Sequence, residues 1–537
     1  MCSEERNFRL KQIKRSGKIL YHTRSFQSII AAMQCRYALT PLDNEDEGKS
    51  FSALLESALE AVGDKLSKVK NQQLQTLKQA PKTVGLVSLG CSKNLVDSEV
   101  MLGLLQGAGY EIIGDAHNAD AVIVNTCGFL GAAVEESLST LADMALMKKD
   151  GKCRALVATG CLPQRDAQLI KMRVPEVDAI LGTTDFPRIV STLDEIFTPA
   201  NSASFAPANS LIQLTVTPRE KHTYVYDHST PRLRATAPWT AYLKIAEGCD
   251  HSCSFCIIPS LRGPFRSRPI ESIVTEARQL AASGAKEIVL VAQDSTRYGL
   301  DLYKKWALGD LLQELSKIEE LSWIRVLYAY PSQVDDSFID AITTAPRVTR
   351  YLDIPLQHAS KEVLARMRRG GHAESYGRLL NRFREKCPEI SIRTSFIVGF
   401  PGETEAQFQE LCDFVKAQKF DRIGVFKFSD EDSALSFGLD SKVPQETIEA
   451  RYHTLQTLQQ KVSLQKNREF IGRELEVLLE SEEPRGMVGR SYRDAPDIDG
   501  NVFVKMTPRE RRSTPSGSMV RVKIVGASEY DLSGKLI

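Results

Sequence analysis

Three cysteines within eight residues form the strongest chemical signal in the sequence. The stretch "EGCDHSCSFCIIPSLRG" (247–263) holds Cys249, Cys253 and Cys256 in the spacing C-x3-C-x2-C. A thioredoxin-like redox pair needs only two of these thiols. A structural zinc site takes four ligands, and neither a fourth cysteine nor a suitably spaced histidine follows. Three thiolates are what a 4Fe–4S cluster needs when one iron stays open for another ligand.

A second group of three cysteines is spread along the sequence before this loop. Cys91, Cys127 and Cys161 each follow a short apolar run that predicts a strand: "VGLVSLGC", "AVIVNTC" and "RALVATGC". In a doubly wound sheet, ligands bind at the carboxyl edge of the parallel strands. The three thiols can therefore converge and hold a second iron–sulfur cluster with one open iron. Cys153 begins the strand that leads to Cys161, so we place it at the opposite edge and exclude it.

The elements around these cysteines predict two α/β domains followed by a β domain. Apolar runs alternate with helical spacing over 81–195, which predicts a doubly wound α/β domain. Six further strand–helix units over 239–467 predict an open, partial (β/α)6 barrel. Its first strand ends at the clustered cysteines, on the face where barrels do chemistry. Short strands separated by Gly, Pro and Ser over 468–537 predict a small β-barrel.

Two segments fall outside these domains. Residues 196–238 are rich in Ser, Thr, Pro and Asn, which predicts a linker. Residues 1–80 predict an extension that is partly disordered and contains one amphipathic helix.

Composition excludes several classes of protein. The 537 residues carry a net charge of +1, which gives no overall attraction to nucleic acid or membrane. No apolar run approaches the roughly 18 residues that a membrane-spanning helix needs. The chain has 11 cysteines and shows no secretory signal peptide. We therefore expect no disulfide framework, a reducing compartment and a cytoplasmic location.

The C-x3-C-x2-C loop after the first strand of a six-strand partial barrel resembles the radical S-adenosylmethionine (SAM) superfamily. The resemblance implies that the open iron binds the amino and carboxylate groups of SAM, and that an electron from the cluster yields a 5′-deoxyadenosyl radical. Phe255, beside the last ligand, also matches this superfamily. Arg262 either offsets the negative charge of the cluster or braces the loop.

Further candidates for SAM binding lie at strand ends on the same face. Gln293 ends the second predicted barrel strand, beside Asp294. Gly399, Gly402 and Glu403 follow the fifth strand, where a plain glycine turn is an equally good interpretation.

Two such clusters followed by a small β-barrel resemble the methylthiotransferase family, over residues 82–535. The resemblance implies that the cluster on Cys91, Cys127 and Cys161 supplies or carries sulfur. It also implies that a second SAM gives the methyl group, that a flavodoxin- or ferredoxin-type protein donates electrons, and that the last domain is a substrate-recognising TRAM domain.

Two branches of this family fit the chemistry. One modifies adenosine in tRNA, and the other modifies the β-carbon of an aspartate in small-subunit ribosomal protein S-twelve (uS12). The motifs "SLGCSKNLVDSE" (88–99) and "DAPDIDGNVF" (494–503) resemble the second branch, whereas the tRNA branch has Gln-Met-Asn in place of Ser92, Lys93 and Asn94. Residues 470–537 hold eleven basic and eleven acidic residues, and a neutral domain containing "DAPDID" suits a basic ribosomal protein better than RNA. We therefore expect a uS12-modifying enzyme. A tRNA-modifying enzyme and a non-catalytic iron–sulfur protein are the alternatives.

Overall fold

The computed structural model describes residues 82–198 and 213–537. The predicted extension and its helix lie outside the described residues, and so does part of the predicted linker. Among the helices within the two described ranges, none is both long and apolar enough to cross a membrane.

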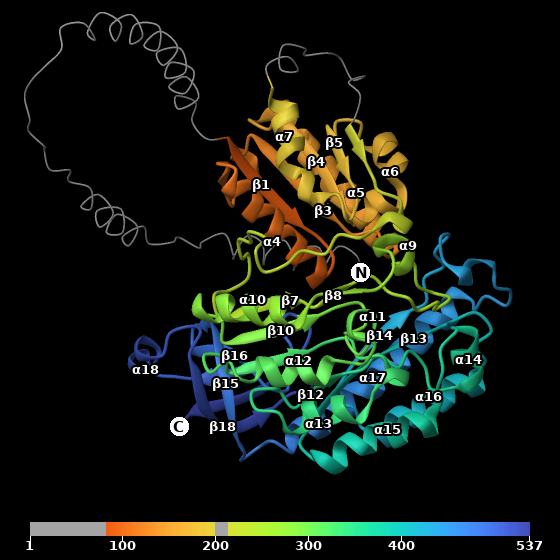
Figure 1. Cartoon of the computed structure of the whole chain (residues 1–537). Helices are drawn as coiled ribbons and strands as arrows, with labels where there is room; N and C mark the ends of the chain where they lie inside the picture. The colour runs from red at the N-terminus through yellow and green to blue at the C-terminus, as the bar shows by residue number, and fades with distance from the viewer. Residues whose placement is uncertain (1–81, 199–212) are drawn as a thin grey trace, which may run out of the picture. The chain divides into compact units, whose positions relative to one another are not determined.

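The first domain is a six-stranded parallel sheet in the order β2-β1-β3-β4-β5-β6 (Figure 1). The strands are β1 (Thr83–Ser88), β2 (Glu111–Ile112), β3 (Ala121–Thr126), β4 (Ala155–Gly160), β5 (Ala179–Leu181) and β6 (Gln213–Thr215). β3 and β4 are buried along their whole length, because helices cover both faces of the sheet. The doubly wound domain predicted from the sequence is therefore confirmed.

The helices of this domain divide between the two faces of the sheet. Alternate strand residues pack against α4 (Ser92–Gly107) and α7 (Ile189–Phe197) on one face. The intervening residues pack against α5 (Gly131–Asp150) and α6 (Cys161–Arg173) on the other. Strand β6 comes from the segment that the sequence assigned to a linker, where its polar composition concealed a short edge strand.

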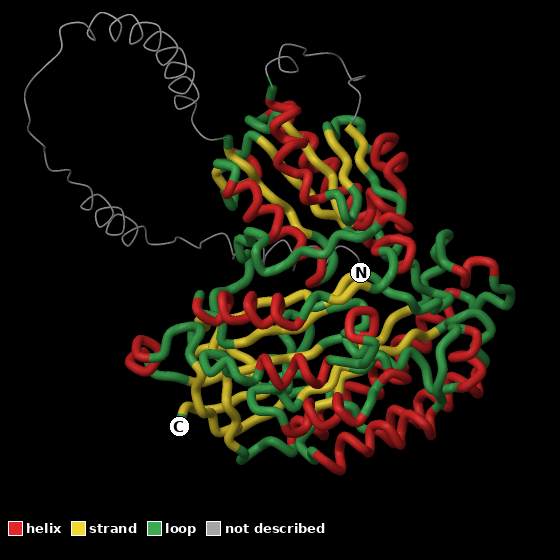
Figure 2. Tube along the Cα trace, in the orientation of Figure 1, coloured by secondary structure: helices red, strands yellow, loops and turns green. Residues whose placement is uncertain are grey.

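The second domain is a partial barrel of six parallel strands in two three-stranded sheets, ordered β11-β10-β7 and β12-β13-β14. One bridge, Ile324 to Val348, links β11 to the segment before β12. Figure 2 shows helices along the outer side of the strands. The strands are β7 (Thr240–Lys244), β10 (Glu287–Val291), β11 (Trp323–Val326), β12 (Tyr351–Asp353), β13 (Ser391–Val398) and β14 (Arg422–Lys427). The main helices are α10 (Ile270–Ala282), α12 (Leu308–Leu315), α13 (Asp336–Thr344), α15 (Ala373–Lys386), α16 (Glu405–Gln418) and α17 (Gln445–Arg468). This arrangement confirms the predicted (β/α)6 barrel.

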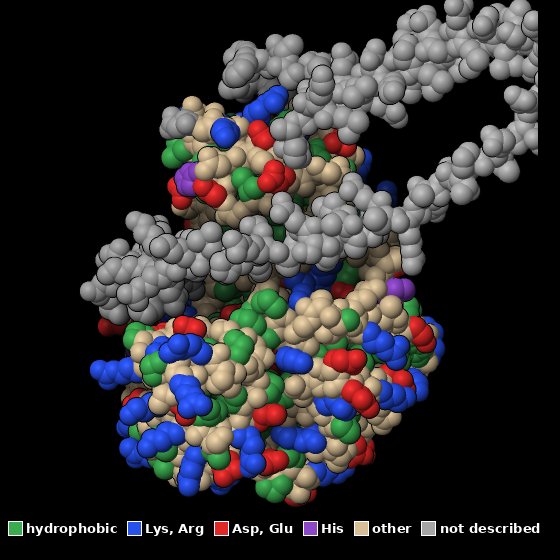
Figure 3. Space-filling view, turned by 90° about the vertical axis from the view of Figure 1, so that its left-hand side faces the viewer, with side chains coloured by type: hydrophobic (Ala, Val, Ile, Leu, Met, Phe, Trp, Pro, Cys, Tyr) green, Lys and Arg blue, Asp and Glu red, His purple; other side chains and the backbone are tan. Residues whose placement is uncertain are grey.

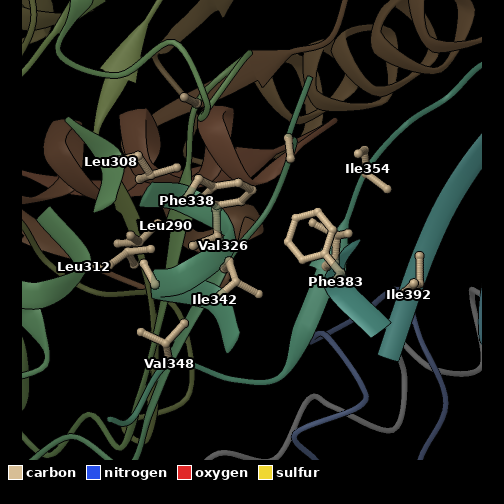
Figure 4. Packing of buried hydrophobic residues seen from close by; sticks show 14 of the residues in the cluster. Leu290, Leu308, Leu312, Val326, Phe338, Ile342, Val348, Ile354, Phe383 and Ile392 are labelled. Carbon is tan, nitrogen blue, oxygen red and sulfur yellow. The ribbon is translucent and has the colours of Figure 1, made fainter. Parts of the chain in front are cut away.

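The core of the partial barrel lies between its strands and its outer helices (Figure 4). Leu290 and Val326 of the strands meet Leu312, Phe338 and Ile342 of α12 and α13, and all five are at most 2% exposed. The barrel wall is thus fixed by apolar packing on its outer side. The opposite side of the strands carries apolar, aromatic and charged side chains together, among them Val289, Tyr242 and Arg325.

The third domain is a closed five-stranded barrel in the order β15-β16-β17-β19-β18, as predicted. Its elements are β15 (Glu474–Glu483), β16 (Gly486–Ser491), β17 (Val502–Lys505), α18 (Pro508–Ser513), β18 (Met519–Ala527) and β19 (Leu532–Leu536). We call it the C-terminal barrel.

The acidic "DAPDID" stretch contacts the partial barrel. Asp494 and Asp499 are shielded there, whereas Asp497 is exposed, so the interpretation that this stretch suits a basic substrate stays a prediction. Asp494 pairs with Arg422 at 2.8 Å. Asp497 accepts a hydrogen bond from the hydroxyl of Tyr242 at 3.1 Å, and Asp499 accepts one from that of Tyr351 at 2.6 Å. The motif therefore joins two domains.

We predict that Asp494→Ala will destabilise the chain by about 3 kcal/mol, because it leaves the buried Arg422 guanidinium without its carboxylate. The midpoint of urea unfolding measures this effect. Glu476→Ala, at an exposed position of β15, is the matched control and should leave the midpoint unchanged. Equal midpoints for the two variants would contradict the assigned role of the motif.

Candidate iron–sulfur site

The carboxyl edge of the N-terminal sheet holds the first three predicted cysteines. Cys91 precedes α4, Cys127 directly follows β3, and Cys161 begins α6 directly after β4. Their strands β1, β3 and β4 are neighbours in the sheet, so all three residues lie at the same edge. The charges of Cys91 and Cys161 both affect the pKa of Cys127. The three thiols therefore lie within electrostatic reach of one another.

A glycine turn permits this approach. Gly90 has a φ of +86°, and a Cβ at this position would lie 2.9 Å from the Cβ of Cys127. Another residue would be strained in its backbone and would displace that cysteine.

The electrostatic surroundings of the three thiols differ. Burial raises the pKa of Cys127 to about 11, and burial also raises that of Cys161. The residue Cys91 as a whole is exposed to solvent. Its thiol is nevertheless surrounded by enough protein atoms for desolvation to act on its pKa. Burial alone would raise its pKa, but the nearby Lys93 ammonium and Arg262 guanidinium hold the pKa below its ordinary value. Cys91 is thus prepared to become a thiolate, the form that binds metal.

The other three cysteines lie in the loop after β8 (Ala246–Glu247). The Cys249 amide donates to the Gly263 carbonyl at 3.1 Å, and the Cys256 amide donates to the Cys253 carbonyl at 3.1 Å. Burial raises the pKa values of Cys249 and Cys256 to about 12. The free thiols are therefore neutral at pH 7, and a bound metal would have to displace their protons.

An aromatic and cationic wall beside this loop was missed in the sequence. His251 stacks on Tyr330 with ring centroids 3.7 Å apart, and its Nε2 lies 2.6 Å from Asp294. Arg369 lies over the same tyrosine ring and places Nη1 3.5 Å from the Cys253 sulfur. These residues fix the loop and place positive charge at one thiol. His251, Tyr330 and Arg369 come from loops far apart in the chain. The spacing of apolar residues in the sequence predicts helices and strands but not contacts of this kind.

Arg262 connects the two groups of cysteines. It belongs to α9 (Ile258–Arg262), directly after the second group. Its Nη1 donates to Asp97 at 2.7 Å, and its Nη2 lies 3.4 Å from the Cys161 sulfur and also donates to Asn94. The side chain is 3% exposed. The guanidinium therefore braces its loop against the other domain and places positive charge at a thiol of that domain. That it offsets the charge of a cluster stays a prediction.

A buried network of charges surrounds Arg262. Lys244 of β7 contacts Asp97 of the N-terminal domain and Glu247 of its own domain. Gln293 donates to the other oxygen of Glu247 at 2.6 Å. Gln293 thus supports this network, and its predicted contact with SAM stays a prediction.

The segment after β6 adds a second connection between the same two domains. Arg232 bonds to Glu99 of α4 and to Glu276 of α10, and it donates to the carbonyl of Tyr242. It lies in the predicted linker, which is therefore anchored here.

The glycine turn after β13 is held by buried charges. Glu403 accepts a hydrogen bond from the Gly399 amide, and its carboxylate lies 3.5 Å from Arg451. Gly399 has a φ of +80°, and a Cβ there would lie 2.3 Å from Ile448. These contacts give Glu403 and Gly399 a structural role, and the role of both residues and of Gly402 in SAM binding stays a prediction. Phe255 is partly buried against the barrel core.

Both groups of cysteines suit an iron–sulfur cluster in their donor chemistry. No three His, Cys, Asp or Glu side chains of residues 82–198 and 213–537 are placed to bind one metal ion. A four-iron cluster requires no such convergence, because each thiolate binds a different iron. Each group provides three thiols beside an arginine, which can offset the charge of a thiolate-bound cluster.

Family models match each of the three domains. Residues 83–182 match uncharacterized protein family UPF0004, residues 243–415 match the radical SAM superfamily, and residues 471–537 match a TRAM domain. Three relatives are named ribosomal protein uS12 methylthiotransferase RimO. The one from Koribacter versatilis is 43% identical, covering 85% of this chain and 97% of the relative. Those from Pelotomaculum thermopropionicum and Geobacter sulfurreducens are 46% and 45% identical, covering 84% and 86% of this chain and 99% and 100% of the relatives.

The chain belongs to the RimO family. It is therefore a methylthiotransferase of the radical SAM class. Among solved structures, the radical SAM methyltransferase TsrM from Kitasatospora setae matches with a TM-score of 0.48 and 16% identity, covering 65% of this chain and 72% of that one. This likeness is too weak to add to the assignment.

The contrast between Cys91 and Cys127 predicts an order of reactivity in cluster-free protein. Because the pKa of Cys91 is lowered and that of Cys127 is raised to about 11, iodoacetamide should reach half of its maximal rate at a lower pH on Cys91. Peptide mass spectrometry across a pH series measures this order. Lys93→Gln should shift the Cys91 profile upward and leave that of Cys127 nearly unchanged. Coincident profiles in the unaltered protein would contradict the assigned charges.

Proposed function

We propose that this chain methylthiolates the β-carbon of an aspartate in ribosomal protein uS12, replacing one hydrogen with SCH3. One observation carries the proposal: Arg262, from the loop of one cysteine group, contacts the Cys161 sulfur of the other. This contact supports two centres acting on one substrate atom. The β-carbon has no useful acidity, so general-base chemistry cannot open its C–H bond, whereas a radical can.

The roles of the cysteines follow from their placement. Cys249, Cys253 and Cys256 would hold the cluster that binds SAM, at the carboxyl end of the first barrel strand. When bound, that cluster supplies the electron that cleaves SAM to a 5′-deoxyadenosyl radical. Cys91, Cys127 and Cys161 would hold the second cluster, which supplies or carries sulfur.

The protein's own residues position these centres and exclude water. Arg262 and Lys244 fix the distance between the domains through Asp97 and Glu247. Arg369 and the His251–Tyr330 stack hold the second cysteine loop. The side chains of Cys249 and Cys253 are at most 9% exposed, which limits access of water and oxygen.

The division of labour among the domains is part of the proposal. Residues 81–195 would be the sulfur-providing domain, 196–238 a connection, 239–467 the radical SAM domain and 468–537 the TRAM domain that recognises uS12. Residues 1–80 would be an extension to this core. We place the reaction in the cytoplasm, with a flavodoxin- or ferredoxin-type protein as the electron donor.

A tRNA substrate is less well supported by the charges. Figure 3 shows positive and negative side chains interspersed on the visible face of the larger part of the molecule. A domain that grips RNA phosphates is expected to concentrate positive charge. Two of the three "DAPDID" acids, Asp494 and Asp499, pair with residues of the partial barrel, so the choice of uS12 rests mainly on the relatives and on the first cysteine motif.

The test uses holoenzyme reconstituted with iron and sulfide, given SAM, a reductant, and either uS12 or tRNA. We predict a gain of about 46 Da on uS12, the mass of SCH3 less one hydrogen, and no change in the nucleosides of tRNA. Modification of tRNA alone would overturn the proposal.

Two variants separate the cysteine groups in this assay. Cys161→Ala should still release 5′-deoxyadenosine but leave uS12 unmodified, while Cys249→Ala should lose both activities. Cys153→Ala, outside both groups, is the control and should behave like the unaltered enzyme.

A further inference from the structure

Lys93 is a buried cation that lacks an acidic partner. Its side chain is 8% exposed, and among the described residues no carboxylate lies within salt-bridge distance of its ammonium group. That group lies 3.5 Å from the ring centroid of Tyr328. Buried charges in proteins are normally paired, because an isolated one costs several kcal/mol. The ionisable side chains that raise the pKa of Lys93 are those of Tyr328 and Cys91, so its ammonium group has no carboxylate partner within residues 82–198 and 213–537 and can accept one from a ligand.

The neighbouring charges do not meet this need. Lys244 and Arg262 share Asp97 and Glu247, so two cations balance two carboxylates. Lys93 forms no ion pair with either carboxylate of this buried network. It sits between the two domains, because it belongs to α4 of the first and covers a tyrosine directly after β11 of the second. The carboxyl end of β11 is on the face where a barrel binds its substrate.

The first turn of α4 offers further groups that favour an anion. Ser92, Lys93 and Asn94 open this helix of 16 residues, whose N-terminal amides carry partial positive charge. The hydroxyl of Ser92 is buried and has no hydrogen-bond partner among the described residues.

We propose that Lys93 binds the side-chain carboxylate of the target aspartate. This inference rests on the proposed function and names the group that recognises its substrate. The ammonium would hold the carboxylate beside Cys91, two residues away in the chain, and so bring the adjacent β-carbon to the sulfur-providing group. An adenosine has no carboxylate to pair with this charge, and methionine at this position suits an uncharged base.

The test measures the binding affinity of two forms of the enzyme for two peptides, in all four combinations. Reconstituted holoenzyme and its Lys93→Met variant are each titrated with a peptide that spans the target aspartate of uS12, and with the same peptide carrying asparagine there. We expect the unaltered enzyme to bind the aspartate peptide at least about 30-fold more tightly than the asparagine peptide. The variant should lose most of this preference, and Lys93→Arg should keep part of it.

Two controls show that the variant remains intact. Its thermal unfolding midpoint should match that of the unaltered enzyme, and its iron content and 5′-deoxyadenosine release are measured so that both peptides are compared on equally loaded protein. A structural or cluster-tuning role for Lys93 would weaken both peptides equally and leave the preference intact. Either that result, or an unaltered enzyme that shows no preference while it methylthiolates uS12, would overturn this inference alone. If the unaltered enzyme does not modify uS12 at all, the proposed function falls and the inference falls with it.

Discussion

The buried charge of Arg262 is the constraint on which the candidate site depends. This side chain leaves the cysteine loop of the partial barrel and ends beside a cysteine of the other domain. Pairing with Asp97 and Glu247 compensates its charge. Such buried pairs add little net stability, because desolvation offsets their attraction. Their directional hydrogen bonds do fix geometry, and geometry is what two centres acting on one carbon atom require.

At both ends of the partial barrel, buried polar and charged side chains are paired with groups from a neighbouring domain. The outer wall of the partial barrel is apolar, while the inner side and ends of that barrel carry charged and aromatic residues that need partners. The N-terminal domain provides partners near the carboxyl ends of the strands, through Asp97 and Glu99 of α4. The C-terminal barrel provides others through "DAPDID", which reaches Arg422 and Tyr351 at the starts of β14 and β12. Charge complementarity thus places both flanking domains.

The sequence predicted the elements and the cysteines better than the contacts between them. The placement of Cys91, Cys127 and Cys161 at strand ends predicted that they share one sheet edge, because alternating strands and helices form a parallel sheet whose carboxyl ends lie together. Strand β6 was hidden by its polar composition. The roles of Tyr330, Arg369 and the "DAPDID" acids depend on contacts between segments far apart in the chain, which local patterns do not encode. The sequence analysis named Lys93 in the first cysteine motif, but that its buried ammonium group lacks a carboxylate partner within the described ranges is seen only in the folded chain.

The most direct test of the account is the magnetic interaction between the two clusters. Electron paramagnetic resonance spectra of reduced holoenzyme are compared with those of variants that keep one cysteine group each. If Arg262 holds the two sites side by side, the spectrum with both clusters reduced will show spin–spin broadening that is absent from the sum of the single-cluster spectra. A spectrum equal to that sum would place the clusters far apart and contradict the central claim.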